Sequence, residues 1–255
     1  MEYGVVNVAA APVRRKARHQ SEMTNQLLFG ETVKVLKEKH DVWLKVQSMH
    51  DGYEGWMTKH QLIGIDEATA KETCDTVSTG LFNLVHIYEK SIRIPFGASL
   101  PRFADGRGVI AGLNYSLDGD AGKRYLNPPN EYSIRQLTFQ WLNSPYQWGG
   151  RTMFGVDCSG FVQVNFKMMG IDLPRDAWQQ AQQGQTIKKL KQAVCGDLAF
   201  FDDKEEIVHV GILLGTDKII HASGKVRIDD INEDGIFHSE TGKQTHSLKV
   251  IKRCC

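Results

Sequence analysis

The stretch from Cys158 to Met169 constrains the fold most, because its apolar residues recur at the spacing of one helix face. These residues are Phe161, Val162, Phe166 and Met169. Gly170 follows at the position where a C′ glycine ends a helix. A loop rich in glycine and aromatic residues, 144–157, precedes the stretch. The pattern predicts a helix that packs on one face and begins with a cysteine.

Short apolar runs of strand length follow this helix, at 197–201, 207–214, 218–223 and 225–228. A polar helix is expected around 176–184. Upstream, Ser133 can cap a further helix that begins near Ile134. Helices followed by a run of antiparallel strands predict an α+β fold for this half of the chain.

The N-terminal half carries brief β-type runs separated by turn residues. The first three runs are 33–36, 42–46 and 53–57. Asp51-Gly52, between the last two, is a strong hairpin signal, and strands this short predict a small barrel. The polar segment 66–73 is a linker or a short helix. Three further runs, 84–88, 92–96 and 108–117, predict a second small β module.

Composition excludes several classes of function. Lys and Arg number 31 against 30 Asp and Glu, a net charge of +1 that gives no electrostatic case for nucleic acid as a partner. No apolar stretch is long enough to insert into a membrane. The N-terminus has no recognisable secretory leader, so we expect a cytoplasmic protein. A chain from which a leader had been removed would look the same and would be secreted or periplasmic.

The five cysteines form no CxxC pair and no disulfide framework, which argues against a structural zinc site. Cys158 stands out because it starts a predicted helix. The first-turn N–H groups and the positive end of the helix dipole stabilise a thiolate there, so we expect a lowered thiol pKa. A structural role as a small buried residue is the alternative.

Two histidines strengthen the reactive interpretation. His209 lies in the middle of one predicted strand, and His221 lies near the end of the next. A short turn between the strands would place the two imidazoles side by side. A helix-start cysteine with two such histidines fits a nucleophile, a base and an orienting group. The other histidines are expected at the surface. A zinc site at these three residues is the alternative, but no carboxylate or cysteine ligand lies nearby in sequence.

Four stretches, read in order, resemble the motifs of the NlpC/P60 cysteine peptidases: VDCSGFVQ (156–163), CGDLAFF (195–201), VHVGILL (208–214) and IIHASG (219–224). The resemblance implies a papain-like catalytic domain over 126–255. The N-terminal half resembles the bacterial SH3-like modules of one branch, the γ-D-glutamyl-L-diamino acid endopeptidases of murein-peptide recycling. Its supporting stretches are 21–31, 43–46, 51–57 and 94–101. This implies two SH3-like β-barrel modules, at 1–68 and 75–125.

The resemblance also assigns roles. Cys158 would be the nucleophile, His209 the general base and His221 the residue that orients it. Tyr146 would line the site and assist there, with loop packing against Trp148 as the alternative. The thiolate would attack the carbonyl that joins γ-D-Glu to meso-diaminopimelate or lysine, and backbone N–H groups would stabilise the oxyanion. This chemistry implies no cofactor and no metal.

Enzymes of this branch require a free N-terminal L-Ala, and a buried ammonium needs a carboxylate partner. The resemblance assigns that carboxylate to Asp157, with Glu22 and Tyr53 as closing contacts from the first module. Further substrate contacts are implied at Ser159, Arg175 and Asp176. Ala177 departs from the serine common in this branch.

The leading hypothesis is therefore a cysteine endopeptidase, a thiol hydrolase that cleaves L-Ala-γ-D-Glu-diamino acid murein peptides during cell-wall recycling. One alternative is a secreted hydrolase of the same chemistry that acts on intact peptidoglycan. Another is a non-catalytic protein that binds cell-wall peptides. Replacing Cys158 with alanine separates catalysis from binding.

Overall fold

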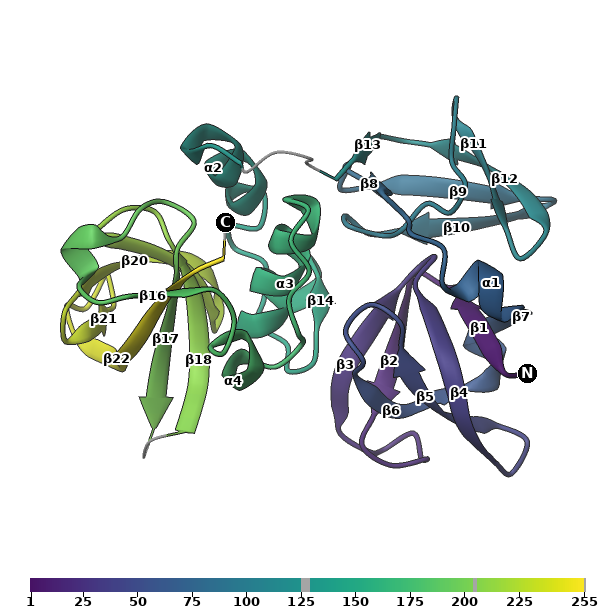
Figure 1. Cartoon of the computed structure of the whole chain (residues 1–255), viewed down its shortest axis with the longest axis horizontal. Coiled ribbons are helices and arrows are strands. Elements are labelled where there is room, and N and C mark those ends of the chain that lie inside the picture. Colours follow the sequence, from purple (N-terminus) through teal and green to yellow (C-terminus); the bar gives the residue numbers. More distant parts are fainter. Residues whose placement is uncertain (125–128, 204–205, 255) are drawn as a thin grey trace. The chain divides into compact units, whose positions relative to one another are not determined.

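The computed structural model describes residues 1–124, 129–203 and 206–254. The chain forms two compact units, drawn in Figure 1. The first comprises Met1–Arg124 together with Trp148–Met153, and the second comprises the remainder of the chain after Arg124. The predicted module boundary at 125/126 and the terminal Cys255 lie outside the described residues.

The first unit begins with a seven-stranded antiparallel sheet in the order β3-β2-β6-β5-β4-β1-β7. Its strands are β1 (Tyr3–Val6), β2 (Ala10–Arg14), β3 (Met23–Leu28), β4 (Thr32–Lys39), β5 (Trp43–Ser48), β6 (Glu54–Thr58) and β7 (Leu62–Ile65), with a 3-10 turn at η1 (Lys59–Gln61). The predicted hairpin at Asp51-Gly52 joins β5 to β6. Three of the strands, β4 to β6, correspond to the runs seen in the sequence.

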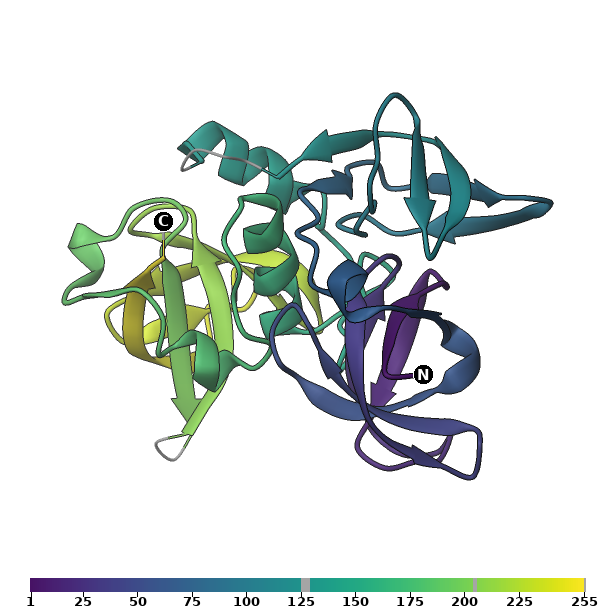
Figure 2. The ribbon, with the colours of Figure 1, turned by 45° about the vertical axis from the view of Figure 1, so that its right-hand side comes forward.

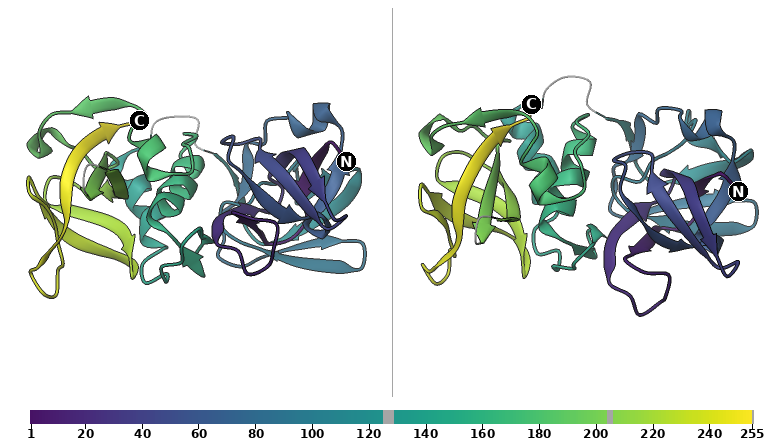
Figure 3. Two further views of the ribbon diagram at one scale, coloured as in Figure 1. Left: turned by 90° about the horizontal axis from the view of Figure 1, so that it is seen from below. Right: turned by 60° about the horizontal axis from the view of Figure 1, so that its bottom comes forward.

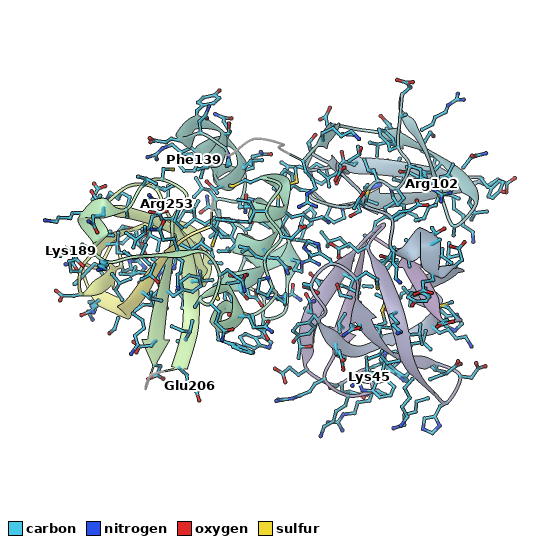
Figure 4. All side chains as sticks on the ribbon, viewed as in Figure 1. Lys45, Arg102, Phe139, Lys189, Glu206 and Arg253 are labelled. Atoms are coloured by element: carbon cyan, nitrogen blue, oxygen red, sulfur yellow. The ribbon has the colours of Figure 1, made fainter. Side chains whose placement is uncertain are left out.

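Period-two alternation positions the side chains of this sheet. Leu44 and Val46 of β5 are buried in its core, whereas Lys45 between them is partly exposed. Lys45, labelled in Figure 4, forms an ion pair with Glu54 of β6 at 2.7 Å. The alternation therefore places one side of β5 in the core and the other toward water.

Beyond β7, α1 (Glu67–Ala70) resolves the predicted choice between linker and helix. Asp66 caps this helix by accepting the Thr69 N–H at 2.7 Å. Six strands follow: β8 (Thr76–Ser78), β9 (Asn83–Ile87), β10 (Lys90–Ile94), β11 (Arg107–Ile110), β12 (Leu113–Asp118) and β13 (Ala121–Lys123). They form a sheet β10-β9-β12-β11 and a separate pair β13-β8, visible in Figure 2.

The run 108–117 is a hairpin and not one continuous stretch. Ala111 and Gly112 both have positive φ, 50° and 77°, as a two-residue hairpin turn requires. Tyr115 of β12 packs in the same hydrophobic cluster as Phe29, which follows β3. Residues on both sides of α1 therefore share a core within the first unit.

The segment Trp148–Met153, which contains β14 (Arg151–Thr152), belongs to the first unit. The Arg151 guanidinium forms a bidentate ion pair with Glu31, at 2.8 and 3.0 Å, and the two side chains are 1% and 3% exposed. Arg151 also donates to the backbone carbonyl of Gln26 at 2.8 Å. Gly149 has φ 77°, and a Cβ there would lie 2.5 Å from the Met23 carbonyl oxygen, so the close approach requires glycine.

The second unit is built on a seven-stranded antiparallel sheet, β16-β22-β17-β18-β19-β20-β21. Its strands are β16 (Gln185–Ile187), β17 (Leu198–Asp203), β18 (Glu206–Leu213), β19 (Lys218–Ser223), β20 (Lys225–Asn232), β21 (Gly235–Phe237) and β22 (Gln244–Arg253), and β15 (Gly155–Val156) lies apart. Because β22 pairs with both β17 and β21, the sheet closes into a barrel. Arg253, labelled in Figure 4, ties the end of β22 to Asp197 with two bonds of 2.7 and 2.8 Å.

Three helices lie on one side of this barrel, as Figures 1 and 3 show: α2 (Glu131–Phe139), α3 (Cys158–Met168) and α4 (Ala177–Gln180). A 3-10 turn, η2 (Leu190–Gln192), precedes β17. The helix predicted to begin near Ile134 begins at Glu131, because Asn130 and not Ser133 is the cap. Asn130 accepts the Ser133 N–H at 2.9 Å. Within the described ranges, no helix combines the length and hydrophobicity needed to cross a bilayer.

The predicted helix at Cys158 is confirmed as α3, and all of its residues are buried. Gly170, at φ 80°, ends it in a Schellman motif. The Ile171 N–H donates to the Phe166 carbonyl at 2.9 Å, and the Gly170 N–H donates to Lys167 at 3.1 Å. The motif therefore defines where α3 ends.

Candidate active site

Cys158 is the first residue of α3, and this helix packs against β18 and β19. The thiol is 5% exposed. The backbone N–H of Val210 hydrogen-bonds to the sulfur, and Val210 directly follows His209 on β18. Helix and strand packing therefore bring the predicted nucleophile to the strand that carries the predicted base.

The environment of Cys158 raises its thiol pKa to about 12. Burial is the main cause, and the negative charge of Asp157 adds to it. Hydrogen bonds from the backbones of Val210 and Ser159 and the charge of Arg175 act in the opposite direction. The sequence predicted a lowered pKa from the helix start alone, and burial outweighs that effect. Cys158 at rest is thus a protonated thiol, and it would need a base to act as the predicted nucleophile.

The two histidines are neighbours on paired strands: His221 of β19 lies opposite Gly211 of β18, two residues from His209. His209 Nε2 is 2.8 Å from His221 Nδ1. On its other side, His221 Nε2 is 3.0 Å from Asp229 Oδ2 on β20. Asp229 is fully buried and also accepts from Arg227 Nε at 2.8 Å and from the Ser239 N–H at 3.0 Å. These contacts form a continuous chain from His209 to a carboxylate.

The chain defines the tautomers of both rings. Burial opposes the charge on Asp229, but hydrogen bonds from His221, Arg227 and Ser239 hold the pKa of its carboxyl far below the usual range. The ionised carboxylate accepts a hydrogen bond from the N–H at His221 Nε2. The proton of His221 is then on Nε2, which leaves its Nδ1 as an acceptor. His209 must then donate from Nε2. Its Nδ1 keeps a free lone pair.

Both imidazoles are neutral near pH 7. Burial lowers the pKa of His209 well below 6.5, and the neighbouring imidazoles of His221 and His246, which disfavour a positive charge beside them, lower it further. Burial also lowers the pKa of His221, against the opposing effect of Asp229. A neutral thiol and a neutral imidazole with one free lone pair can pass a proton when substrate arrives.

Sequence reasoning missed Asp229 and Arg227. A hairpin across Gly224 pairs His221 with Arg227, and Asp229 lies two residues further along the same strand. Period two then places both charged residues on one face of β20. Charged residues on the face that also carries His221 were the signal that could have identified them.

Tyr146 is held in place by its backbone. Its N–H donates to the Gly224 carbonyl at 2.9 Å, and the neighbouring Gln147 N–H donates to Val156 at 3.0 Å. The phenol is partly exposed, and burial, followed by the charges of Cys158 and Asp157, raises its pKa. Tyr146 is therefore a neutral hydroxyl. Its predicted role stays a prediction.

Three of the predicted substrate residues form one buried cluster. Arg175, 1% exposed, donates to Asp157 Oδ2 at 2.6 Å and to Ser159 Oγ at 2.8 Å. Asp157 Oδ1 caps α3 by accepting the Gly160 N–H at 2.7 Å. Asp176 is the N-cap of α4, and its N–H donates to Gln179 at 3.4 Å. Arg175 thus supports Asp157, and substrate contacts at these residues stay predictions.

Glu22 and Tyr53 belong to the first unit, whereas Asp157 belongs to the second. The Glu22 carboxylate accepts from Arg15 at 3.0 Å and from Trp148 Nε1 at 2.9 Å. Tyr53 packs against the core of the first sheet. The predicted contacts of both residues with substrate stay predictions.

His246 on β22 was expected at the surface but stacks on His209. The ring centroids are 4.2 Å apart and the ring planes differ by 22°. Both imidazoles line a pocket of about 300 Å³ in the second unit, together with Tyr146, Val208, Ala222, Ser223 and Gly224. The pairing of β22 with β17 and β21 brings His246 here, a relationship that no local sequence pattern shows.

A cysteine at the start of a helix, packed on an antiparallel barrel that carries a His–His–Asp chain, defines the class as a cysteine peptidase. Residues 143–244 match the NlpC/P60 family, and residues 13–62 match the bacterial dipeptidyl-peptidase SH3 domain. The chain belongs to the NlpC/P60 family. It thus has an NlpC/P60 papain-like fold with an SH3-like domain. The predicted second SH3-like module at 75–125 stays a prediction.

Two relatives are similar over most of the chain. A γ-D-glutamyl-L-lysine dipeptidyl-peptidase of Bacillus subtilis is 34% identical over 77% of this chain and 71% of its own length. A protein of the same name from Bacillus cereus is 28% identical over 89% of this chain and 76% of its own. The crystal structure of an NlpC/P60 family protein from Bacillus cereus superposes with a TM-score of 0.82, at 22% identity, over 99% of both chains. That likeness concerns the fold.

Proposed function

We propose that this cysteine peptidase is an endopeptidase that hydrolyses the bond between γ-D-Glu and an L-diamino acid in murein peptides. The observation that carries the proposal is the similarity over most of both lengths to a relative named γ-D-glutamyl-L-lysine dipeptidyl-peptidase. The similarity is too long to be confined to the catalytic half. It therefore covers parts of both units, and not the chemistry alone.

The reaction follows from the protonation states. His209 Nδ1 takes the Cys158 proton as the sulfur attacks the γ-carbonyl of D-Glu. His221 and Asp229 stabilise the resulting imidazolium through the two hydrogen bonds described above. The imidazolium then protonates the leaving amine, and water hydrolyses the thioester. Backbone N–H groups at the start of α3 stabilise the oxyanion.

We also propose that the substrate carries a free N-terminal L-Ala, whose ammonium requires a carboxylate. Asp157 is the proposed partner because it directly precedes the nucleophile and is held by Arg175 and Ser159. Glu22 and Tyr53 are proposed as further contacts of the amine. A requirement for a free amine would restrict the enzyme to short peptides, as in cytoplasmic recycling of the cell wall.

The test is product analysis by mass spectrometry. The substrates are L-Ala-γ-D-Glu-diaminopimelate, its lysine counterpart and the N-acetylated form of each. We expect cleavage of the free peptides to L-Ala-D-Glu and the diamino acid, and no cleavage by C158A. Cleavage of the acetylated forms as well would overturn the amine requirement and favour a hydrolase of intact peptidoglycan. Cleavage of none would overturn the endopeptidase proposal and favour a binding protein.

A further inference from the structure

The pocket of about 300 Å³ lined by His209 lies where the leaving group of the proposed reaction is expected. A general base that takes the proton of the nucleophile later gives it to the leaving amine, so the leaving residue must lie against that base. His209 lines this pocket, and the stacked ring of His246 forms a neighbouring part of its wall. An occupant of the pocket therefore touches the group that protonates the leaving nitrogen.

We infer that this pocket is the subsite for the leaving diamino acid, that it binds the α-carboxylate of that residue, and that His246 determines its specificity. The inference rests on the proposed function, because it identifies the leaving group as an amino acid. It adds a site and a residue that the reaction at Cys158 alone does not require.

The walls of the pocket favour a carboxylate. Its lining residues include Tyr146 and Ser223, which carry hydroxyls, and His246, which carries an imidazole, and none of them is acidic. Arg227, which lies opposite His221 on β20 and is ion-paired with Asp229, donates to the carbonyl oxygen of the lining residue Ser223. Hydroxyl and imidazole donors in a lining without an acidic residue suit an anion, whereas an ammonium would have no carboxylate partner there.

Acyl transfer measures binding at this subsite separately from the acylation of Cys158. L-Ala-γ-D-Glu-p-nitroanilide would acylate Cys158 and release p-nitroaniline. The thioester then reacts with water or with an added amine. With an amine, the new C–N bond forms as the C–S bond breaks, and His209 moves the amine proton to the departing sulfur. By microscopic reversibility, the added amine binds where the leaving residue left.

The experiment measures, by mass spectrometry, the ratio of the transfer product L-Ala-γ-D-Glu-Lys to the hydrolysis product as L-lysine is increased. We expect saturable transfer to L-lysine and transfer at least about tenfold weaker to L-lysinamide, which lacks the carboxylate. His246→Ala and Ser223→Ala should each lower transfer to L-lysine severalfold. His86→Ala, which removes a half-buried imidazole on β9 in the first unit, should leave the ratio unchanged.

Because both products arise from one acyl-enzyme, the ratio does not depend on the rate of acylation. Equal transfer to L-lysine and L-lysinamide by the parent enzyme would overturn carboxylate recognition. An unchanged ratio in His246→Ala, with nitroaniline still released, would overturn the role of His246. If the parent enzyme releases no nitroaniline although C158-dependent peptidase activity is present on other peptides, the proposed function fails instead.

Discussion

The Nε2 atom of His209 lies 2.8 Å from the Nδ1 atom of His221, so the two rings share one hydrogen bond whose direction decides which nitrogen of His209 is basic. The carboxylate of Asp229 sets this direction from 3.0 Å away on the far side of His221. Asp229 therefore sets the tautomer of the proposed base, His209, through the imidazole of His221.

Asp229→Asn tests this chain. The asparagine amide can donate to His221 Nε2, which would place the proton of that ring on Nδ1 and reverse the shared bond. His209 would then carry its own proton on Nδ1, where the lone pair is needed. We expect kcat to fall on the order of a hundredfold or more, as expected when the wrong tautomer is stabilised. Steady-state kinetics on the tripeptide measures the loss, and a kcat within threefold of the parent would contradict the assignment.

The activity should persist below the pH at which an ordinary histidine is protonated. His209 must be neutral to accept the thiol proton, and burial holds its pKa well below 6.5. Activity therefore declines only as pH falls through this lowered pKa. A profile of kcat/KM against pH measures the acid limb. An apparent pKa at or above 6.5 for that limb would contradict the lowered pKa of His209.

Stability should also decrease toward acid pH. Burial is the main cause that lowers the pKa of His246 from 6.5 to about 4 in the folded chain. The unfolded chain therefore binds more protons between these values, and the stabilising contribution is lost as pH falls from about 6.5 toward 4. Thermal unfolding at several pH values should show the Tm falling across this window. The fall should be smaller in His246→Phe, which cannot titrate, and an equal fall would contradict the prediction.

The ion pair of Arg151 and Glu31 should be expensive to break. Replacing Arg151 with alanine leaves a carboxylate that is 3% exposed without its bidentate partner. Loss of one partner from such a pair typically lowers the free energy of unfolding by about 3–5 kcal/mol. Denaturant unfolding of the full chain measures the change. Lys45→Ala breaks the exposed pair with Glu54 and is the matched control, with an expected loss of about 1 kcal/mol or less.

Local patterns predicted the part of the site that is local in the chain. Apolar spacing and Gly170 predicted α3, and two strand runs predicted the pairing that joins His209 to His221. Only residues 214–217 separate these strands, so little information beyond this short connection was needed. The predicted Ser133 cap was wrong, because Asn130, three residues earlier, caps α2.

The rest depends on contacts distant in sequence. His246 reaches His209 only because β22 closes the barrel, and strand order at that distance leaves no periodic trace in the sequence. The pKa of Cys158 depends on burial as well as on helix position, and burial is a property of the folded chain. The sequence showed the helix terminus but not the desolvation that outweighs it.

Because Trp148–Met153 belongs to the first unit, it affects which N-terminal and catalytic halves can be combined in one chain. This segment lies between Tyr146 and Cys158 in the chain, yet Arg151 has its ion-pair partner, Glu31, in the N-terminal half. An evolutionary exchange of N-terminal halves between relatives would therefore succeed only if six residues of the catalytic half changed with them. The buried ion pair between Arg151 and Glu31 therefore links the evolution of the N-terminal and catalytic halves.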